Sequence, residues 1–537
     1  MLENIFNHFK KSRIGTKFLS NVSPKIWAGS ILALIISFLL YVSLKFIDTD
    51  LYYIIATGRN IIENHAVPHI NPFISTPDYG IVIQNWLYCT LVAGIYNIFH
   101  SFGLWLLQIL FLITMILIIF KFFGFNKSDK KYVILLIAAI TIKIFIYHNL
   151  RPEMLTFSLI MLELILLEAY IKSDKILYLY LIPFLMLVEI NSHSSYWIMH
   201  FIVILPYIMN ITFKSYLKPA YINIKKLKKA IVPFFLMIAI MFVNPYGIKN
   251  ITYVYDALSS GVFDIINVFE QQPLSLFSWE SIFIITSVFI FLLMFYNKKL
   301  KSTTFYMFIG TTILVFFAKK WVPFYSIGFL YLMRDLYMEM KLNKNYKKYT
   351  FFTNKLYTVF FISIITGYYI GQIFYTQPSG MFSISSDIYM EKTGAVSRGY
   401  GEFDAFCDYL DKNDPNATVY AYFSDANYFE FRGYKVYSDA RPELYVGKIG
   451  DGSNIIMNDY AITFGINLYS YYNFDFYDKT TSYLSYDDYG HFLEVIDTDY
   501  FLISGDNNFL VYYLDNNTEK YELVVESNNF RFYHKIS

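Results

Sequence analysis

Two aspartates, Asp48 and Asp50, stand one residue apart at the end of a long apolar segment, in the stretch FIDTDLYYIIATGRN (46–60). A carboxylate in this position can act as a general base or bind a cation. Residues i and i+2 of a helix point about 200° apart, so both carboxylates serve one centre only if 48–50 is extended. We therefore expect one catalytic acid, against the structural alternative that Asp48 or Thr49 caps the following helix.

Basic residues follow in two other short polar stretches that separate apolar segments. Arg151 lies in HNLRPE, and an arginine there can hold a phosphate with two parallel hydrogen bonds. Lys319 and Lys320 invite the same interpretation, although lysines at helix ends are common. The alternative for all three is that they contact lipid headgroups while their stems lie along apolar surface. The sequence favours a phosphate-binding role for Arg151 first.

Asn191 and His193 occupy a short turn between two apolar segments. They could bind a ligand by hydrogen bonds, but an interfacial histidine with satisfied hydrogen bonds is the more frequent case. His65 and His69 are four residues apart, which is metal-ligand spacing only on a helix, and Pro68 interrupts a helix between them. No defined metal site is predicted, and a divalent cation, Mg²⁺ or Mn²⁺, stays open as a cofactor.

The elements that must position these residues are mostly membrane-length helices. The chain is 56% hydrophobic and 16% charged over 537 residues, which is typical of a multi-pass membrane protein. We expect a mainly α polytopic fold with about 11 spans. The candidate segments lie near 26–46, 103–123, 131–147, 152–171, 176–190, 195–213, 229–244, 278–296, 303–319, 321–337 and 353–376.

The distribution of charge orients these segments. If 84–99 stays on the outer surface, 23 Lys and Arg fall on the amino-terminal side and five on the other. The positive-inside rule then predicts a cytoplasmic-membrane protein with its N-terminus in the cytoplasm. The loop 47–102 and everything after 376 would lie outside.

The stretch 51–62 carries apolar residues at helical spacing, with Thr57, Arg59, Asn60 and Glu63 on the other side. This pattern predicts an amphipathic helix that lies flat on a membrane.

Residues 377–537 differ from the rest and predict a second domain. They carry 25 acidic against 11 basic residues, a net −14, whereas residues 1–376 carry +16. A helical stretch at 402–412 followed by β-like runs predicts a small extracytoplasmic α/β domain. We expect Asp439, Arg441 and Glu443 to form a structural network in it, and the alternative is that they reach the acceptor.

The order of short motifs resembles the GT-C superfamily of membrane glycosyltransferases. The motifs run from D-x-D, G-R, V-P, N-P-F and W-L within 48–87 through RPE, NSH and NPYG to a glutamate near 270. They end with a basic pair before VPF at 319–324 and YKVYSDARPELY at 434–445.

That resemblance implies transfer of a sugar from a polyprenyl-phosphate carrier by an inverting mechanism, with Asp48 as base and Asp50 as second candidate. Arg151, Lys319 and Lys320 would bind the donor phosphate. Substrate contacts would come from Arg59, His65, Trp86, Asn191, His193 and Glu270.

The chain departs from the usual motifs of these enzymes at several positions. Asn85 stands where a glutamate often precedes W-L, SDAR replaces D-G-R near 439–441, and 270–272 reads EQQ.

The sequence predicts an enzyme that glycosylates an extracytoplasmic glycan, lipid or protein, and it gives no sign of nucleic-acid binding. Two alternatives remain: a transporter or flippase of lipid-linked saccharides, and a non-catalytic scaffold of a surface-polymer assembly.

Overall fold

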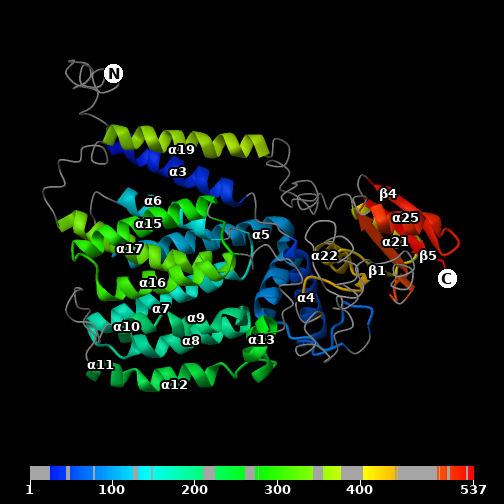
Figure 1. The fold of residues 1–537 in the computed structure, drawn as a ribbon, viewed down its shortest axis with the longest axis horizontal. Coiled ribbons are helices and arrows are strands. Elements are labelled where there is room, and N and C mark those ends of the chain that lie inside the picture. The colour runs from blue at the N-terminus through cyan, green and yellow to red at the C-terminus, as the bar shows by residue number, and fades with distance from the viewer. Residues whose placement is uncertain are drawn as a thin grey trace, which may run out of the picture.

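The computed structural model describes a helical bundle joined to a small α/β domain (Figure 1). The described residues are 24–43, 49–76, 79–124, 131–146, 149–209, 224–259, 273–275, 277–342, 355–376, 403–441, 444, 493–494, 496–504, 508–527 and 530–536.

Each of the eleven apolar segments predicted as a span contains a helix. The bundle consists of α3 (Pro24–Ser43), α5 (Trp86–Phe122), α6 (Lys131–Ile140), η1 (Thr141–Phe145), α7 (Glu153–Ser173), α8 (Leu177–Ser192), η2 (Ser194–Tyr196), α9 (Trp197–Ile202), α10 (Leu205–Met209), α11 (Ile224–Lys229), α12 (Ile231–Ile240), α13 (Ile248–Ser259), α15 (Trp279–Tyr296), α16 (Ser302–Phe317), η4 (Lys319–Trp321), α17 (Val322–Leu342) and α19 (Lys355–Thr376). In the described part of the chain, α5 and α7 are long and apolar enough to cross a membrane, and several other apolar helices are shorter. The number of spans therefore stays a prediction.

Helix α5 contains a break that separates its two halves. His100 has a φ of 51° and a ψ of −149°, outside the helical region. The break falls between the outer segment 84–99 and the span 103–123 that the sequence distinguished. The position of 84–99 in the membrane interface stays a prediction.

Helix α4 (Asp50–Asn64) stands between the bundle and the α/β domain (Figure 1). The sequence predicted that its apolar stripe rests on a membrane, but the stripe is buried within the protein, with Leu51, Ile54 and Ile55 almost inaccessible. The other side is not free, because Thr57 is also buried, at 1% exposure. The helix is therefore clamped between two layers of protein and does not rest only on a membrane surface.

Gly58 allows α4 to pack closely against α5. A Cβ atom at this position would overlap the carbonyl oxygen of Cys89 and the side chain of Ala93. Glycine is therefore required here by the closeness of the two helices.

The α/β domain contains, in chain order, α21 (Phe403–Asn413), β1 (Thr418–Tyr420), α22 (Phe423–Arg432), β2 (Lys435–Val436), β3 (Tyr500–Ser504), α25 (Asn508–Asn516), β4 (Tyr521–Ser527) and β5 (Phe530–Lys535). Helix α21 and the five strands lie where the sequence predicts them, whereas α22 and α25 were not predicted. The strands form a five-stranded sheet in the order β2-β1-β3-β5-β4. The β2-β1-β3 pairings are parallel and the β3-β5-β4 pairings are antiparallel.

The loop after α4 joins the edge of this sheet. The backbone N–H of Val436 donates to Phe73 at 2.9 Å, and Ser75 donates to Val436 at 2.8 Å. One buried apolar cluster continues from α4 and α5 through this loop into the α/β domain. The loop and the α/β domain therefore share a core, and the division at 376/377 stays a prediction.

Candidate active site

A polar cavity of about 220 Å³ lies where α4, the start of α7, the turn after α8 and the α/β domain meet. Its walls include Asp50, Arg151, Glu153, His193 and Arg441. Four of these five residues were predicted from the sequence as site or network residues. The fold thus brings together residues that are up to 391 positions apart.

Asp50 and Arg151 form an ion pair on the wall of the cavity. An Oδ2 atom of Asp50 lies 3.0 Å from a guanidinium nitrogen of Arg151. Asp50 is the first residue of α4, and Arg151 precedes α7, so each side chain projects from the beginning of a helix. The two side chains are 28% and 17% exposed, which leaves them accessible from the cavity.

A guanidinium that is held in this way suits a phosphate-bearing ligand. Arginine keeps its charge at all physiological pH values, and its planar fork matches the oxygens of a phosphate. The carboxylate of Asp50 restricts the orientation of this fork. The pair can therefore present a fixed cation to the cavity.

The capping role considered for Thr49 is wrong. Thr49 occupies the N-cap position of α4, but its side chain makes no capping hydrogen bond. Its backbone carbonyl instead accepts a hydrogen bond from Asn427 of α22 at 3.1 Å. The start of α4 is thus fixed by the α/β domain.

His193 lies at the opposite wall and is held from behind by Thr156. The Nδ1 atom of His193 lies 2.8 Å from the hydroxyl of Thr156, and that hydroxyl donates to Glu189 at 2.8 Å. A threonine hydroxyl has one hydrogen, so the bond to His193 must use the Nδ1–H of the histidine as donor. The histidine is then the tautomer whose Nε2 atom accepts hydrogen bonds.

The Nε2 atom of His193 is directed towards Glu153, with 3.9 Å between Nε2 and Oε1. His193 belongs to the turn that follows α8, outside both flanking helices. Burial lowers the pKa of this histidine to about 4, an effect that the nearby Glu189 opposes. The side chain is therefore neutral at physiological pH.

The polar contacts continue from Glu189 into the bundle. His200 lies 3.8 Å from Glu189 through Nε2 and 2.5 Å from Glu163 through Nδ1. All three side chains are at most 1% exposed. Buried acids and histidines are stable in an apolar interior only when they are paired, so this cluster fixes α7 and α8 against the helix that carries His200.

Arg441 forms the wall of the cavity on the side of the α/β domain. Its guanidinium donates to both oxygens of Glu430 at 2.9 Å, pairs with Asp439, and donates to Thr57 of α4 at 2.9 Å. The predicted network is therefore present for Asp439 and Arg441, and it also reaches α4. Glu443 lies outside the described residues.

Burial also affects Tyr53, which lines the cavity beside Asp50. Desolvation raises its pKa well above the usual value, and the charge of Asp50 acts in the same direction. Tyr53 thus remains a neutral phenol. Its ring also lies 5.1 Å from the guanidinium carbon of Arg441, a cation–π contact.

Several predicted site residues lie elsewhere. Arg59 donates to the carbonyl of Phe431 at 3.2 Å and stacks near Tyr96, so it joins α4 to the α/β domain. Asn191 accepts from the indole of Trp86 at 2.9 Å and donates to two backbone carbonyls. His65 ends α4 with a φ of 50° and is exposed.

Lys319 and Lys320 lie in η4 and do not line the cavity. The Tyr196 ring lies 4.6 Å from that of His193 and 5.9 Å from that of Trp321, so rings connect His193 to this turn. Asp48 and Glu270 lie outside the described residues.

Sequence reasoning assigned no role to Thr156, Glu153 or Tyr53. Glu153 stands in the RPE stretch that carries Arg151, and Tyr53 is one helical turn after Asp50. The nearness of Glu153 to Arg151 and of Tyr53 to Asp50 in the sequence was the signal that could have identified these two residues. Thr156 gives no such signal, because its partner His193 is 37 residues away.

Within the described part of the chain, no group of three His, Cys, Asp or Glu residues could hold a metal ion. Asp50, Glu153 and His193 face one cavity, but Asp50 is paired with Arg151, so the described side chains do not form a three-ligand metal centre. A divalent cation, Mg²⁺ or Mn²⁺, stays a prediction.

No protein-family model matches the sequence, and no curated protein matches it significantly. The fold is similar to that of the oligosaccharyltransferase of Archaeoglobus fulgidus. The apo form of that protein has a TM-score of 0.54 and 10% identity over 89% of this chain and 70% of that one.

Two further structures of the same protein are similar. One is tethered to an acceptor peptide with the NVT sequon, with a TM-score of 0.52, 10% identity and coverage of 92% and 72%. The other, a complex with Zn and sulfate, has a TM-score of 0.52 and 11% identity over 94% of this chain and 73% of that one. The similarity shows that the chain shares the fold of this oligosaccharyltransferase.

Proposed function

We propose that this chain is a membrane glycosyltransferase that transfers a sugar from a polyprenyl-phosphate carrier to an extracytoplasmic glycan, lipid or protein. The observation that carries the proposal is the cavity in which Arg151 is held by Asp50 at the junction of the bundle and the α/β domain. The GT-C fold supports it.

In this proposal Arg151 binds the phosphate of the donor. The sugar C1–oxygen bond breaks during transfer, and the electron pair stays on the leaving phosphate. A fixed guanidinium stabilises this developing charge, which lowers the barrier to transfer. Lys319 and Lys320 are candidates for a secondary contribution, because the ring contacts connect their turn to His193.

The base would be Asp48, as the motif order implies. It removes the proton from the acceptor, the acceptor atom attacks the sugar C1 from the side opposite the phosphate, and the anomeric configuration inverts. Asp50, the second candidate, is bound to Arg151 in the structure. We assign Asp50 the role of positioning that arginine.

His193 and Glu153 complete the cavity as substrate contacts. The Nε2 atom of His193 accepts a hydrogen bond from a sugar or acceptor hydroxyl, and Arg441 limits the space above. A peptide is the first acceptor to test, because the similar oligosaccharyltransferase was solved with an acceptor peptide.

The test is incubation of the purified protein with short-chain polyprenyl-phosphate sugars and measurement of released polyprenyl phosphate. We expect release by the wild type, none by Asp48→Asn, and normal release by Lys412→Gln, an exposed residue of α21 that does not line the cavity. Equal release by Asp48→Asn would refute its role. Binding of every donor without release would favour the flippase or scaffold instead.

A further inference from the structure

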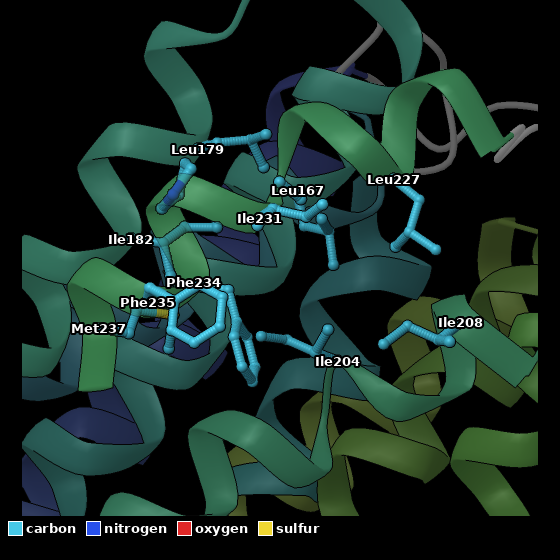
Figure 2. Close-up of a pocket in the computed structure, with 12 residues that line it drawn as sticks. Leu167, Leu179, Ile182, Ile204, Ile208, Leu227, Ile231, Phe234, Phe235 and Met237 are labelled. Atoms are coloured by element: carbon cyan, nitrogen blue, oxygen red, sulfur yellow. The ribbon is translucent and has the colours of Figure 1, made fainter. Parts of the chain in front are cut away.

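A second cavity, of about 260 Å³, lies in the helical bundle. Its lining differs from that of the active-site cavity in residue type. Figure 2 shows its lining, which is entirely apolar and comes from α7, α8, α12 and the helices between them. Leu167, Leu179, Ile182, Leu227 and Phe234 surround it. No lining residue carries a group that could do chemistry.

This apolar groove is open along the outer side of α12. Ile231 is 50% exposed and Phe235 is 63% exposed, although both line it. In a membrane protein, such a groove faces the acyl chains of the bilayer. Its entirely apolar lining suits an acyl chain.

A basic cluster marks one end of the groove, where α11 meets the turn between α7 and α8. Lys229 forms a 2.9 Å ion pair with Asp174, and Lys226 donates to the carbonyl of Ile171. The Tyr170 hydroxyl also donates to the carbonyl of Lys226 at 2.8 Å. These contacts fix the rotation of α11 and direct Leu227 into the groove.

Two other lysines of α11 remain on its exposed face. Lys225 and Lys228 are three residues apart, so they share one side of the helix. Lys175 is exposed and directly follows Asp174, the residue that pairs with Lys229. Three exposed cations thus border the end of an apolar groove.

We propose that the apolar groove and its lysines bind an anionic phospholipid. One acyl chain occupies the groove, and Lys225, Lys228 and Lys175 contact the headgroup phosphate. Basic pockets between membrane helices recognise anionic lipid headgroups in this way. The inference does not depend on the proposed glycosyltransferase activity.

The test uses the full chain, purified in detergent and freed of lipid, in native mass spectrometry. Dioleoylphosphatidylglycerol and dioleoylphosphatidylcholine share their acyl chains and differ in headgroup charge. We expect the anionic lipid to bind about tenfold more tightly to the wild type. The double variant K225Q/K228Q should lose this preference, and K412Q/K435Q, with the same charge change on the α/β domain, should keep it.

A second pair of variants tests the groove. Ala230→Trp fills it and should weaken binding of both lipids, and Ile231→Trp, at a more exposed position, serves if the first fails to fold. Equal binding of the two lipids by the wild type overturns the proposal, as does an equal loss in K412Q/K435Q. Competition by excess glycerol phosphate would assign the lysines to free phosphate and overturn the lipid assignment.

Discussion

Asp50 and Arg151 meet at 3.0 Å, one at the start of α4 and the other before α7. They are 101 positions apart, and each was singled out from the sequence for a different role. Their pairing changes the roles proposed for Asp48 and Asp50, because the carboxylate of Asp50 forms an ion pair with Arg151. The proposed base is then Asp48 alone.

We predict that Thr156 sets the tautomer of His193. Thr156→Val removes the hydroxyl that accepts from Nδ1–H, whereas Thr156→Ser keeps it. Nitrogen-15 spectra of labelled histidine should show an Nδ1–H tautomer in the wild type and in Thr156→Ser, and a shift towards Nε2–H in Thr156→Val.

Activity provides a second readout of the same contact. If the Nε2 atom of His193 accepts a hydrogen bond from a substrate hydroxyl, Thr156→Val should raise the KM for the substrate that carries this hydroxyl. Thr156→Ser should have the KM of the wild type. An Nε2–H tautomer in the wild-type protein would contradict the role assigned to Thr156. It would leave the proposed binding of the donor phosphate by Arg151 unaffected.

The pH dependence of stability follows from the same histidine. Its pKa falls from the usual value of 6.5 to about 4 in the folded chain. Between these values the unfolded chain binds the proton and the folded chain does not, so the free energy of unfolding decreases as the pH falls from about 6.5 to about 4. The loss is on the order of 3 kcal/mol.

Thermal unfolding in detergent at a series of pH values measures this loss. His193→Gln should show a flatter profile between pH 6.5 and 4 and the same profile above pH 7. A wild-type profile that matches the variant throughout would show that His193 is solvated.

The close contact of α4 with α5 predicts opposite outcomes at two glycines. Gly58→Ala introduces a Cβ atom into the Cys89 carbonyl and should cost about 1–3 kcal/mol of stability. Gly94→Ala, on α5, meets nothing within 4 Å and should be neutral or stabilising by up to about 1 kcal/mol. Denaturation midpoints of the two variants test this, and equal midpoints would contradict the helix packing.

The ion network above the cavity predicts a large loss of stability in Arg441→Gln. The change leaves Glu430 and Asp439 buried without their cation, at a cost of about 3–5 kcal/mol. Arg531→Gln, in a more exposed network, should cost no more than about 1 kcal/mol. Limited proteolysis and thermal unfolding compare them, and similar losses would show that the Arg441 network is solvated.

The sequence predicts much of this fold because its elements are regular. Apolar runs and period-two stretches depend on neighbouring residues, so the helices of the eleven apolar segments, α21 and the five strands are found where expected. Helices α13, α22 and α25 were not predicted. The break at His100 also falls between two segments that the sequence separated.

The site is less predictable because its contacts are distant in sequence. Thr57 occupies the polar side of an amphipathic helix, yet it is buried under Arg441, 384 residues away. Asn191 and Trp86 are in motif positions that suggest substrate contacts, yet they bond to each other. Only the packing of the layers decides which polar residue faces the cavity.

The affinity for a polyprenyl phosphate, the leaving group of the proposed reaction, tests the phosphate-binding role of Arg151 directly. The comparison covers the wild type, Arg151→Lys, Arg151→Gln and the control Lys412→Gln on α21. Removal of a charged hydrogen-bond donor should weaken binding by about tenfold or more in Arg151→Gln. Arg151→Lys should fall between, because lysine keeps the charge and loses the fork. Unchanged affinity in Arg151→Gln, with a normally folded protein, would contradict the claim that this cavity binds the donor phosphate.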